Sequence, residues 1–118
     1  MATKTYKDLI VWNKSFLLAK DVYKLTDNLP KNEIYGISSQ LQRCAVSIPS
    51  NIAEGQQRNN IKEYRHFIGI AKGSSAELET QLLLISDIYN INCENQIQLL
   101  YEIQKMLTTL LKRLEPST

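Results

Sequence analysis

The longest regular pattern in the chain runs from residue 61 to residue 89. Within it, apolar or small side chains recur at alternating steps of three and four residues. They occupy Ile61, Tyr64, Ile68, Ala71, Ser75, Leu78, Leu82, Ile85 and Tyr89. This spacing places all of them on one face of an α-helix that is roughly 45 Å long at the usual rise per residue. The segment therefore predicts one long amphipathic helix.

Three further segments carry the same periodicity, at about 8–28, 33–57 and 94–114. Their expected inward stripes are Leu9, Trp12, Phe16, Ala19 and Tyr23; Ile37, Leu41, Ala45, Ile48 and Ile52; and Ile97, Leu100, Ile103, Leu107, Leu110 and Leu114. No alternating strand pattern of useful length is present, and the connections between the segments are short. The sequence therefore predicts an all-α fold, an up-down antiparallel four-helix bundle in a single domain over residues 1–118.

The second predicted helix contains a proline, Pro49, in its interior. A proline there removes one hydrogen bond and costs about 3 kcal/mol, so we expect a kinked helix supported by packing. Ser47, Asn51 and Glu54 share a helix face nearby, and Gly55 is a plausible place for the helix to loosen. We expect Asn51 and Glu54 to make hydrogen bonds or ion pairs, either within the bundle or across a subunit boundary.

Two features of the sequence concern close helix contacts and self-association. Gly69, Gly73 and Ser74 place small residues midway along the longest helix, which would allow another helix, from this chain or a neighbouring copy, to approach closely. Apolar side chains also lie outside the expected core stripes, and such surface is typical of an interface. These are Ile10, Val11, Leu17, Leu18, Leu83 and Leu84.

Basic residues also recur at helical spacing. The series comprises Arg43, Arg58, Lys62, Arg65 and Lys72. One interpretation is a cationic stripe for the phosphate backbone of RNA or DNA; the other is ordinary solvated surface, partly neutralised by Glu54 and Glu63. Residues 1–73 carry eleven Lys/Arg against six Asp/Glu, and residues 74–118 carry three against six. This asymmetry could attract an anionic partner to one end of the molecule or align copies head to tail.

The sequence offers little for catalysis. His66 is the single histidine, and Cys44 and Cys93 form no C-x-x-C pair, so we expect buried free thiols and no metal or cofactor site. No nucleophile–base pair can be assembled from the spacing, which argues against an enzyme. The N-terminus is too polar for a signal peptide, and no apolar run is long enough to span a membrane. We therefore expect a cytoplasmic protein without membrane contact.

The chain resembles the small bacterial four-helix-bundle proteins named for open reading frames in 23S rRNA intervening sequences. The resemblance extends from about Tyr6 to Leu114. It rests on Asp8-Leu9, Val11-Trp12, Leu29-Pro30, Glu33, Gln40, Arg43, the nonapeptide from Ser47 to Gly55, Ala71-Lys72-Gly73-Ser74 and Glu77-Leu78-Glu79. Cys44 departs from the family, which usually has alanine there.

The resemblance implies a bundle that assembles as a ring-shaped homopentamer. The family is similar to the accessory variability determinant of diversity-generating retroelements, which binds nucleic acid and a reverse transcriptase. Two hypotheses follow from the residues and the resemblance together. The first is a non-enzymatic homo-oligomer that binds nucleic acid or a nucleoprotein partner through its basic face. The second is a protein-binding adaptor or scaffold that makes no contact with nucleic acid.

Overall fold

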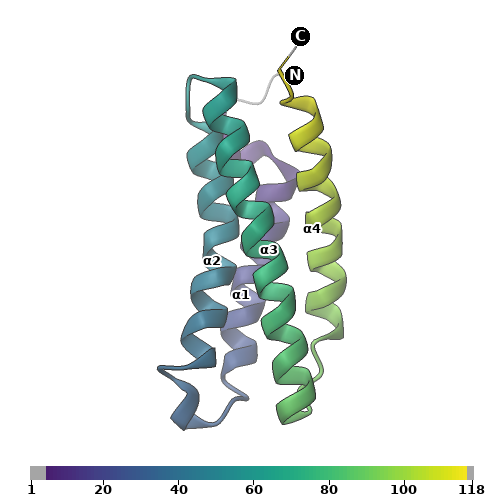
Figure 1. The fold of residues 1–118 in the computed structure, drawn as a ribbon. Coiled ribbons are helices and arrows are strands. Elements are labelled where there is room, and N and C mark those ends of the chain that lie inside the picture. The colour runs from purple at the N-terminus through teal and green to yellow at the C-terminus, as the bar shows by residue number, and fades with distance from the viewer. Residues whose placement is uncertain (1–4, 117–118) are drawn as a thin grey trace.

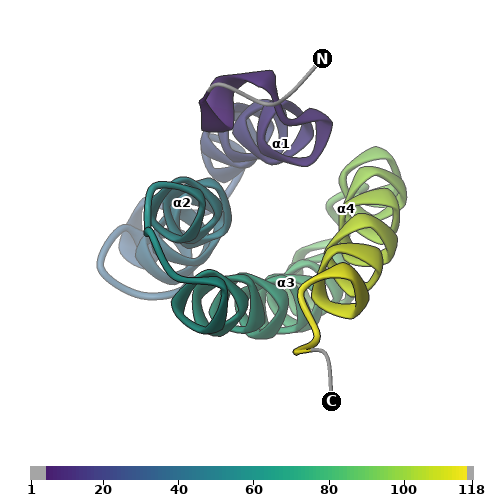
Figure 2. The ribbon, with the colours of Figure 1, turned by 90° about the horizontal axis from the view of Figure 1, so that it is seen from above.

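A computed structural model of the chain describes residues 5–116 and consists of four α-helices that run alternately up and down (Figure 1). The α-helices are α1 (Ile10–Thr26), α2 (Ile37–Gln56), α3 (Ile61–Tyr89) and α4 (Glu94–Arg113), and the short 3-10 turns are η1 (Tyr6–Asp8) and η2 (Lys31–Glu33). Viewed along the bundle axis, the helices follow one another in chain order around the core (Figure 2). Among the described residues, no helix is long and apolar enough to cross a membrane.

The core confirms three of the four expected stripes. In α2, Leu41, Ala45, Ile48 and Ile52 are buried, as are Ile68, Ala71, Leu78, Leu82 and Ile85 in α3 and Leu100, Ile103 and Leu107 in α4. The ends of the stripes are less covered, since Ile61 is exposed at the start of α3 and Leu114 is half-buried after α4. Burying these aliphatic side chains, at about 1.5–3 kcal/mol each, is the main force that holds the helices together.

The stripe predicted for the first helix is correct for Ala19, which is buried, and in part for Leu9 and Trp12, which pack half-buried against the core. The buried face of α1 is Val11, Ser15, Leu18, Ala19, Val22 and Leu25, whereas Phe16 and Tyr23 are each 48% exposed. Val11 and Leu18 were expected outside the core and lie within it. Two helical stripes with the same spacing run along this segment, so periodicity alone does not identify the inner one. The aliphatic stripe packs in the core, and the aromatic stripe lies beside it at the surface.

Helix α2 begins at Ile37, four residues later than the start expected from periodicity. Pro30 instead leads into η2, whose Glu33 carboxylate accepts a hydrogen bond from the Tyr89 hydroxyl at the end of α3. This contact ties the segment before α2 to the end of α3. Helix α3 begins and ends where the sequence predicts, with Asn60 accepting a hydrogen bond from the Glu63 amide as the N-cap.

Helix α2 continues through Pro49 without interruption, and Pro49 is buried; the kink there stays a prediction. The close helix approach falls at Gly55 and not at the two glycines of α3. A Cβ on Gly55 would lie 2.8 Å from the Phe67 Cβ, whereas a Cβ on Gly69 or Gly73 would meet nothing within 4 Å. Gly55 therefore lets α2 and α3 pack closely, while Gly69 and Gly73 face open space in the described chain.

Candidate interaction surfaces

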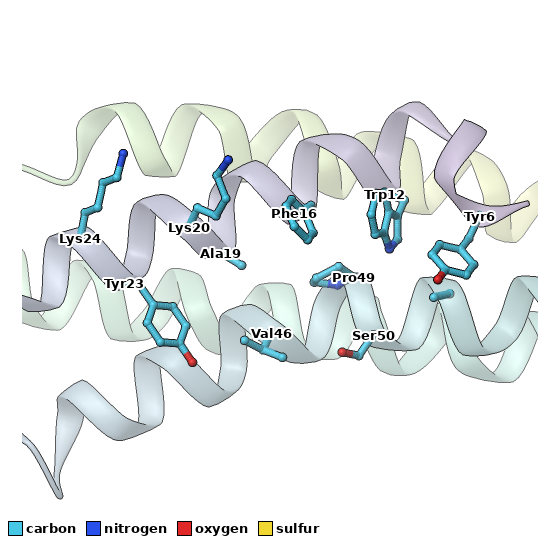
Figure 3. A pocket seen from close by; sticks show the side chains of 11 residues that line it. Tyr6, Trp12, Phe16, Ala19, Lys20, Tyr23, Lys24, Val46, Pro49 and Ser50 are labelled. Atoms are coloured by element: carbon cyan, nitrogen blue, oxygen red, sulfur yellow. The ribbon is translucent and has the colours of Figure 1, made fainter.

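An apolar groove of about 650 Å³ lies between α1 and α2 and is here called the aromatic groove. It is lined by Tyr6, Trp12, Phe16, Ala19, Lys20, Tyr23 and Lys24 on one side and by Val46, Pro49, Ser50 and Ala53 on the other. Figure 3 shows the aromatic side chains of α1 facing Pro49 across the groove, with the amino groups of Lys20 and Lys24 directed away from α2. The lining contains no carboxylate.

The aromatic groove is built from the outer stripe of α1. The Tyr6 and Trp12 ring centroids lie 5.2 Å apart and those of Trp12 and Phe16 lie 5.0 Å apart, so the rings form a continuous wall. The Lys20 ammonium lies 5.7 Å from the Phe16 ring, within cation–π range. Pro49 supplies an apolar ring opposite this wall. A contiguous apolar surface with a basic rim is suited to covering by the apolar face of a partner.

A second hollow, the polar pocket, lies between α2 and α3 and has a volume of about 530 Å³. Its lining includes five of the polar residues that carry the family resemblance, Gln40, Arg43, Ser47, Ser74 and Glu77. The full set is Tyr35, Gly36, Ser39, Gln40, Arg43, Cys44, Ser47, Ser74, Glu77 and Gln81. Arg43, which the sequence places in the basic series, thus lies opposite an acidic residue in a pocket of mixed charge and not with the other basic side chains.

The nonapeptide supports this pocket through a hydrogen-bond relay. The Asn51 Nδ2 group donates to the Ser47 carbonyl at 2.8 Å and to the Ser47 hydroxyl at 3.0 Å. The Ser47 and Ser74 hydroxyls share a hydrogen bond of 2.8 Å that joins α2 to α3. Glu54 pairs with Arg58 at 3.6 Å, and both side chains are largely exposed. These contacts lie within the bundle; a role for Asn51 or Glu54 in assembly stays a prediction.

Both cysteines are buried free thiols. Cys44 donates its thiol hydrogen to the Ser74 carbonyl at 3.0 Å, at the floor of the polar pocket. Burial, together with the nearby Glu77 carboxylate, raises the pKa of Cys44 to about 12, and burial also raises the pKa of Cys93. Each thiol is therefore neutral at physiological pH.

We expect neither cysteine to react readily with Ellman's reagent at pH 8 in the native protein. The thiolate is the reactive form, and a raised pKa together with burial suppresses it. Release of the coloured product should be more than about tenfold slower than in denaturant, where both thiols return to an ordinary pKa. Rapid labelling of one thiol in the folded protein would contradict this prediction.

The remaining basic residues of α3 line two hollows together with basic residues of α4 that were not predicted from the sequence. Lys62 and Arg65 line one shallow hollow with Arg113, and Lys72 lines another with Lys105. We call these five residues the basic face. Within residues 5–116, the two salt bridges join Lys14 to Glu102 and Arg58 to Glu54, so no member of the basic face is paired. The signal that could have found the α4 members is the spacing of Lys105, Thr109 and Arg113 at steps of four.

Arg58 lies at the margin of the basic face. Its guanidinium carbon is 4.9 Å from the Phe67 ring and its charge is shared with Glu54, so it is less available to a partner than its neighbours. Arg58, Lys62 and the exposed His66 line a further small hollow. Among the described residues, no three His, Cys, Asp or Glu side chains gather where they could hold a metal ion.

Comparison with known proteins agrees with the helical architecture. A solved structure described as a protein of unknown function from the S23 ribosomal protein family of Bacteroides thetaiotaomicron is similar, with a TM-score of 0.75 and 27% sequence identity. The similarity covers 87% of this chain and 99% of that one. No curated protein matches the chain. The family model for the 23S rRNA-intervening sequence protein matches residues 7–112, and the chain belongs to this family.

Proposed function

We propose that this protein is a non-enzymatic homo-oligomer that binds nucleic acid, or a nucleoprotein partner, through the basic face. The observation that carries the proposal is the gathering of five Lys and Arg side chains from α3 and α4. None of them has a salt-bridge partner within residues 5–116, and they flank hollows of about 730 and 660 Å³. Unpaired cations on neighbouring helices suit the phosphate backbone, whose binding is driven by the release of counterions.

The aromatic groove supports the homo-oligomeric part of the proposal. Phe16 and Tyr23 remain about half exposed in a single copy, and Leu83, Leu84 and Ile88 of α3 are also exposed. In a ring, each subunit would place its aromatic groove against the exposed aliphatic side chains of α3 on the next subunit. Both surfaces would then be covered. The family resemblance implies five subunits. Such a ring would also repeat the basic face around its axis and so strengthen phosphate binding.

Charge reversal at Arg65 and Lys72 tests the nucleic-acid part. We expect R65E/K72E to bind a labelled RNA hairpin or single-stranded DNA about tenfold or more weakly at low salt, measured by fluorescence anisotropy. The salt dependence of binding should also become shallower, by about one phosphate contact for each cation removed. Since α4 completes the face, K105E/R113E should weaken binding as well.

The matched control is K7E/K31E, which makes the same change in net charge at two exposed lysines of η1 and η2. This control should retain wild-type affinity if the basic face is the binding site. If the control loses as much affinity for nucleic acid as R65E/K72E does, the effect comes from net charge and not from the basic face. Wild-type binding that is absent, or that does not vary between roughly 50 and 200 mM salt, would refute the electrostatic proposal.

A protein-binding adaptor is the second candidate, and the aromatic groove is the observation that favours it. An apolar groove without carboxylates suits a protein partner, for example a reverse transcriptase, better than a phosphate backbone. The two candidates differ in measurable ways. An adaptor would not bind RNA even at low salt. Its binding to the partner protein would be unchanged in R65E/K72E and would be lost when the aromatic groove is altered.

A further inference from the structure

The polar pocket has features that neither self-association nor phosphate binding uses. We propose that it binds a small zwitterion of about dipeptide size, whose ammonium group meets Glu77 and Gln81 and whose carboxylate meets Arg43. The pocket lies between α2 and α3 and contains no member of the basic face, so this inference is independent of nucleic-acid binding. Its volume of about 530 Å³ is typical of small-molecule sites.

The first observation is an unsatisfied acceptor. Gln81 is only 6% exposed, and its Oε1 atom is buried without a hydrogen-bond partner among the described residues. A buried polar atom that lacks a partner destabilises the fold, so such atoms are few in native proteins and call for an explanation. Because Gln81 lines the polar pocket, a rotation of its carboxamide could present this oxygen to a ligand N–H group that supplies the missing donor.

The second observation is the arrangement of charge. Arg43 and Glu77 line the same pocket from different helices, yet no salt bridge joins them or pairs either with another described residue. Among the described residues, the Arg43 guanidinium donates one hydrogen bond, a long one of 3.4 Å to the Ser39 hydroxyl, which leaves most of its donors open. Glu77 lines the pocket together with Cys44, and its carboxylate contributes to the raised pKa of that thiol. Two opposite charges that line one pocket without a salt bridge between them suit a ligand that carries both.

The third observation concerns the serine hydroxyls. Ser47 and Ser74 use one hydroxyl hydrogen in the bond between them, and the Ser47 hydroxyl also accepts a hydrogen bond from Asn51. One hydroxyl hydrogen of the pair is therefore left over at the pocket wall. The pocket thus offers donors from Arg43 and one serine, and acceptors from Glu77 and Gln81. This set matches a carboxylate and an ammonium separated by a polar spacer such as a peptide bond.

Isothermal titration calorimetry with glycylglycine tests the proposal, and two probes isolate its charges. Glycylglycine amide lacks the carboxylate, and N-acetylglycylglycine lacks the ammonium. We expect glycylglycine to bind at least tenfold more tightly than either. R43Q should abolish its advantage over the amide, and E77Q should abolish its advantage over the acetylated probe. Equal affinity for all three probes, or no saturable binding in the millimolar range, would overturn the proposal.

Gln81→Met separates a binding role from a structural one. Removing an unpartnered buried amide should raise the melting temperature of the free protein, while glycylglycine binding weakens several-fold. If Gln81 only supports the fold, the variant should instead melt at a lower temperature and bind glycylglycine as the wild type does. A change of oligomeric state in R43Q or E77Q, with no effect on glycylglycine, would assign the polar pocket to a subunit contact and overturn the ligand proposal.

Discussion

If the protein self-associates as we propose, replacing Phe16 by glutamate should shift it towards monomers. Phe16 is 48% exposed in the centre of the aromatic groove, where a partner surface would have to bury the introduced charge. Loss of a central aromatic contact costs about 2 kcal/mol or more for each interface, which weakens each contact about 30-fold. Sedimentation velocity or multi-angle light scattering at micromolar concentration would measure the shift.

Leu17→Glu is the matched control for this prediction. Leu17 is the next residue of α1 and has the same exposure, 48%, but it does not line the groove. Both variants introduce one carboxylate at a half-exposed apolar position of the same helix, so circular dichroism should show similar helicity. If Leu17→Glu dissociates the protein and Phe16→Glu does not, the assembly surface lies on the other side of α1. If both remain assembled, the aromatic groove is free for a different partner.

The buried face was predicted for α2, α3 and α4 and only in part for α1, and the reason is physical. In α2, α3 and α4 one stripe consists of apolar or small residues, so the 3.6-residue period identifies the buried face. In α1 the stripe through Trp12 and Phe16 and the stripe through Leu18 and Val22 are both apolar. Only the positions of the other helices decide which one is covered, and that information is not local in the sequence.

The residues of the basic face were predicted only where they lie together on one helix. Lys62, Arg65 and Lys72 lie on one helix and were found by their spacing. Lys105 and Arg113 join them from α4 because the bundle places the two helices side by side, which periodicity within a segment does not report.

The surroundings of Arg43 could not be predicted for the same reason, and its role in binding nucleic acid stays a prediction. Arg43 lies on α2, and the side of α3 that α2 packs against presents Glu77 and Gln81 to it across the polar pocket. Spacing along α2 identifies the face that carries Arg43. It does not report which residues of α3 lie opposite that face.

Gly55→Ala should destabilise the protein, although alanine is the better helix former. The added Cβ would lie 2.8 Å from the Phe67 Cβ and 3.1 Å from the Tyr64 carbonyl oxygen, both fixed to α3, so the helices would have to move apart. Overpacking of this kind costs about 1–3 kcal/mol, which outweighs the gain of about 1 kcal/mol in helix propensity. Thermal unfolding followed by circular dichroism should show a melting temperature several degrees lower.

Gly69→Ala makes the same chemical change where the chain leaves room. Nothing lies within 4 Å of the new Cβ, so only the propensity term acts and stability should rise by up to about 1 kcal/mol. A loss of stability in Gly55→Ala together with a gain in Gly69→Ala would place the close α2–α3 contact at Gly55. A Gly55→Ala protein as stable as the wild type would show that this contact relaxes without cost. A Gly69→Ala protein that loses its assembly state would instead place a neighbouring subunit against the small residues of α3, because the open space at Gly69 is measured in a single copy.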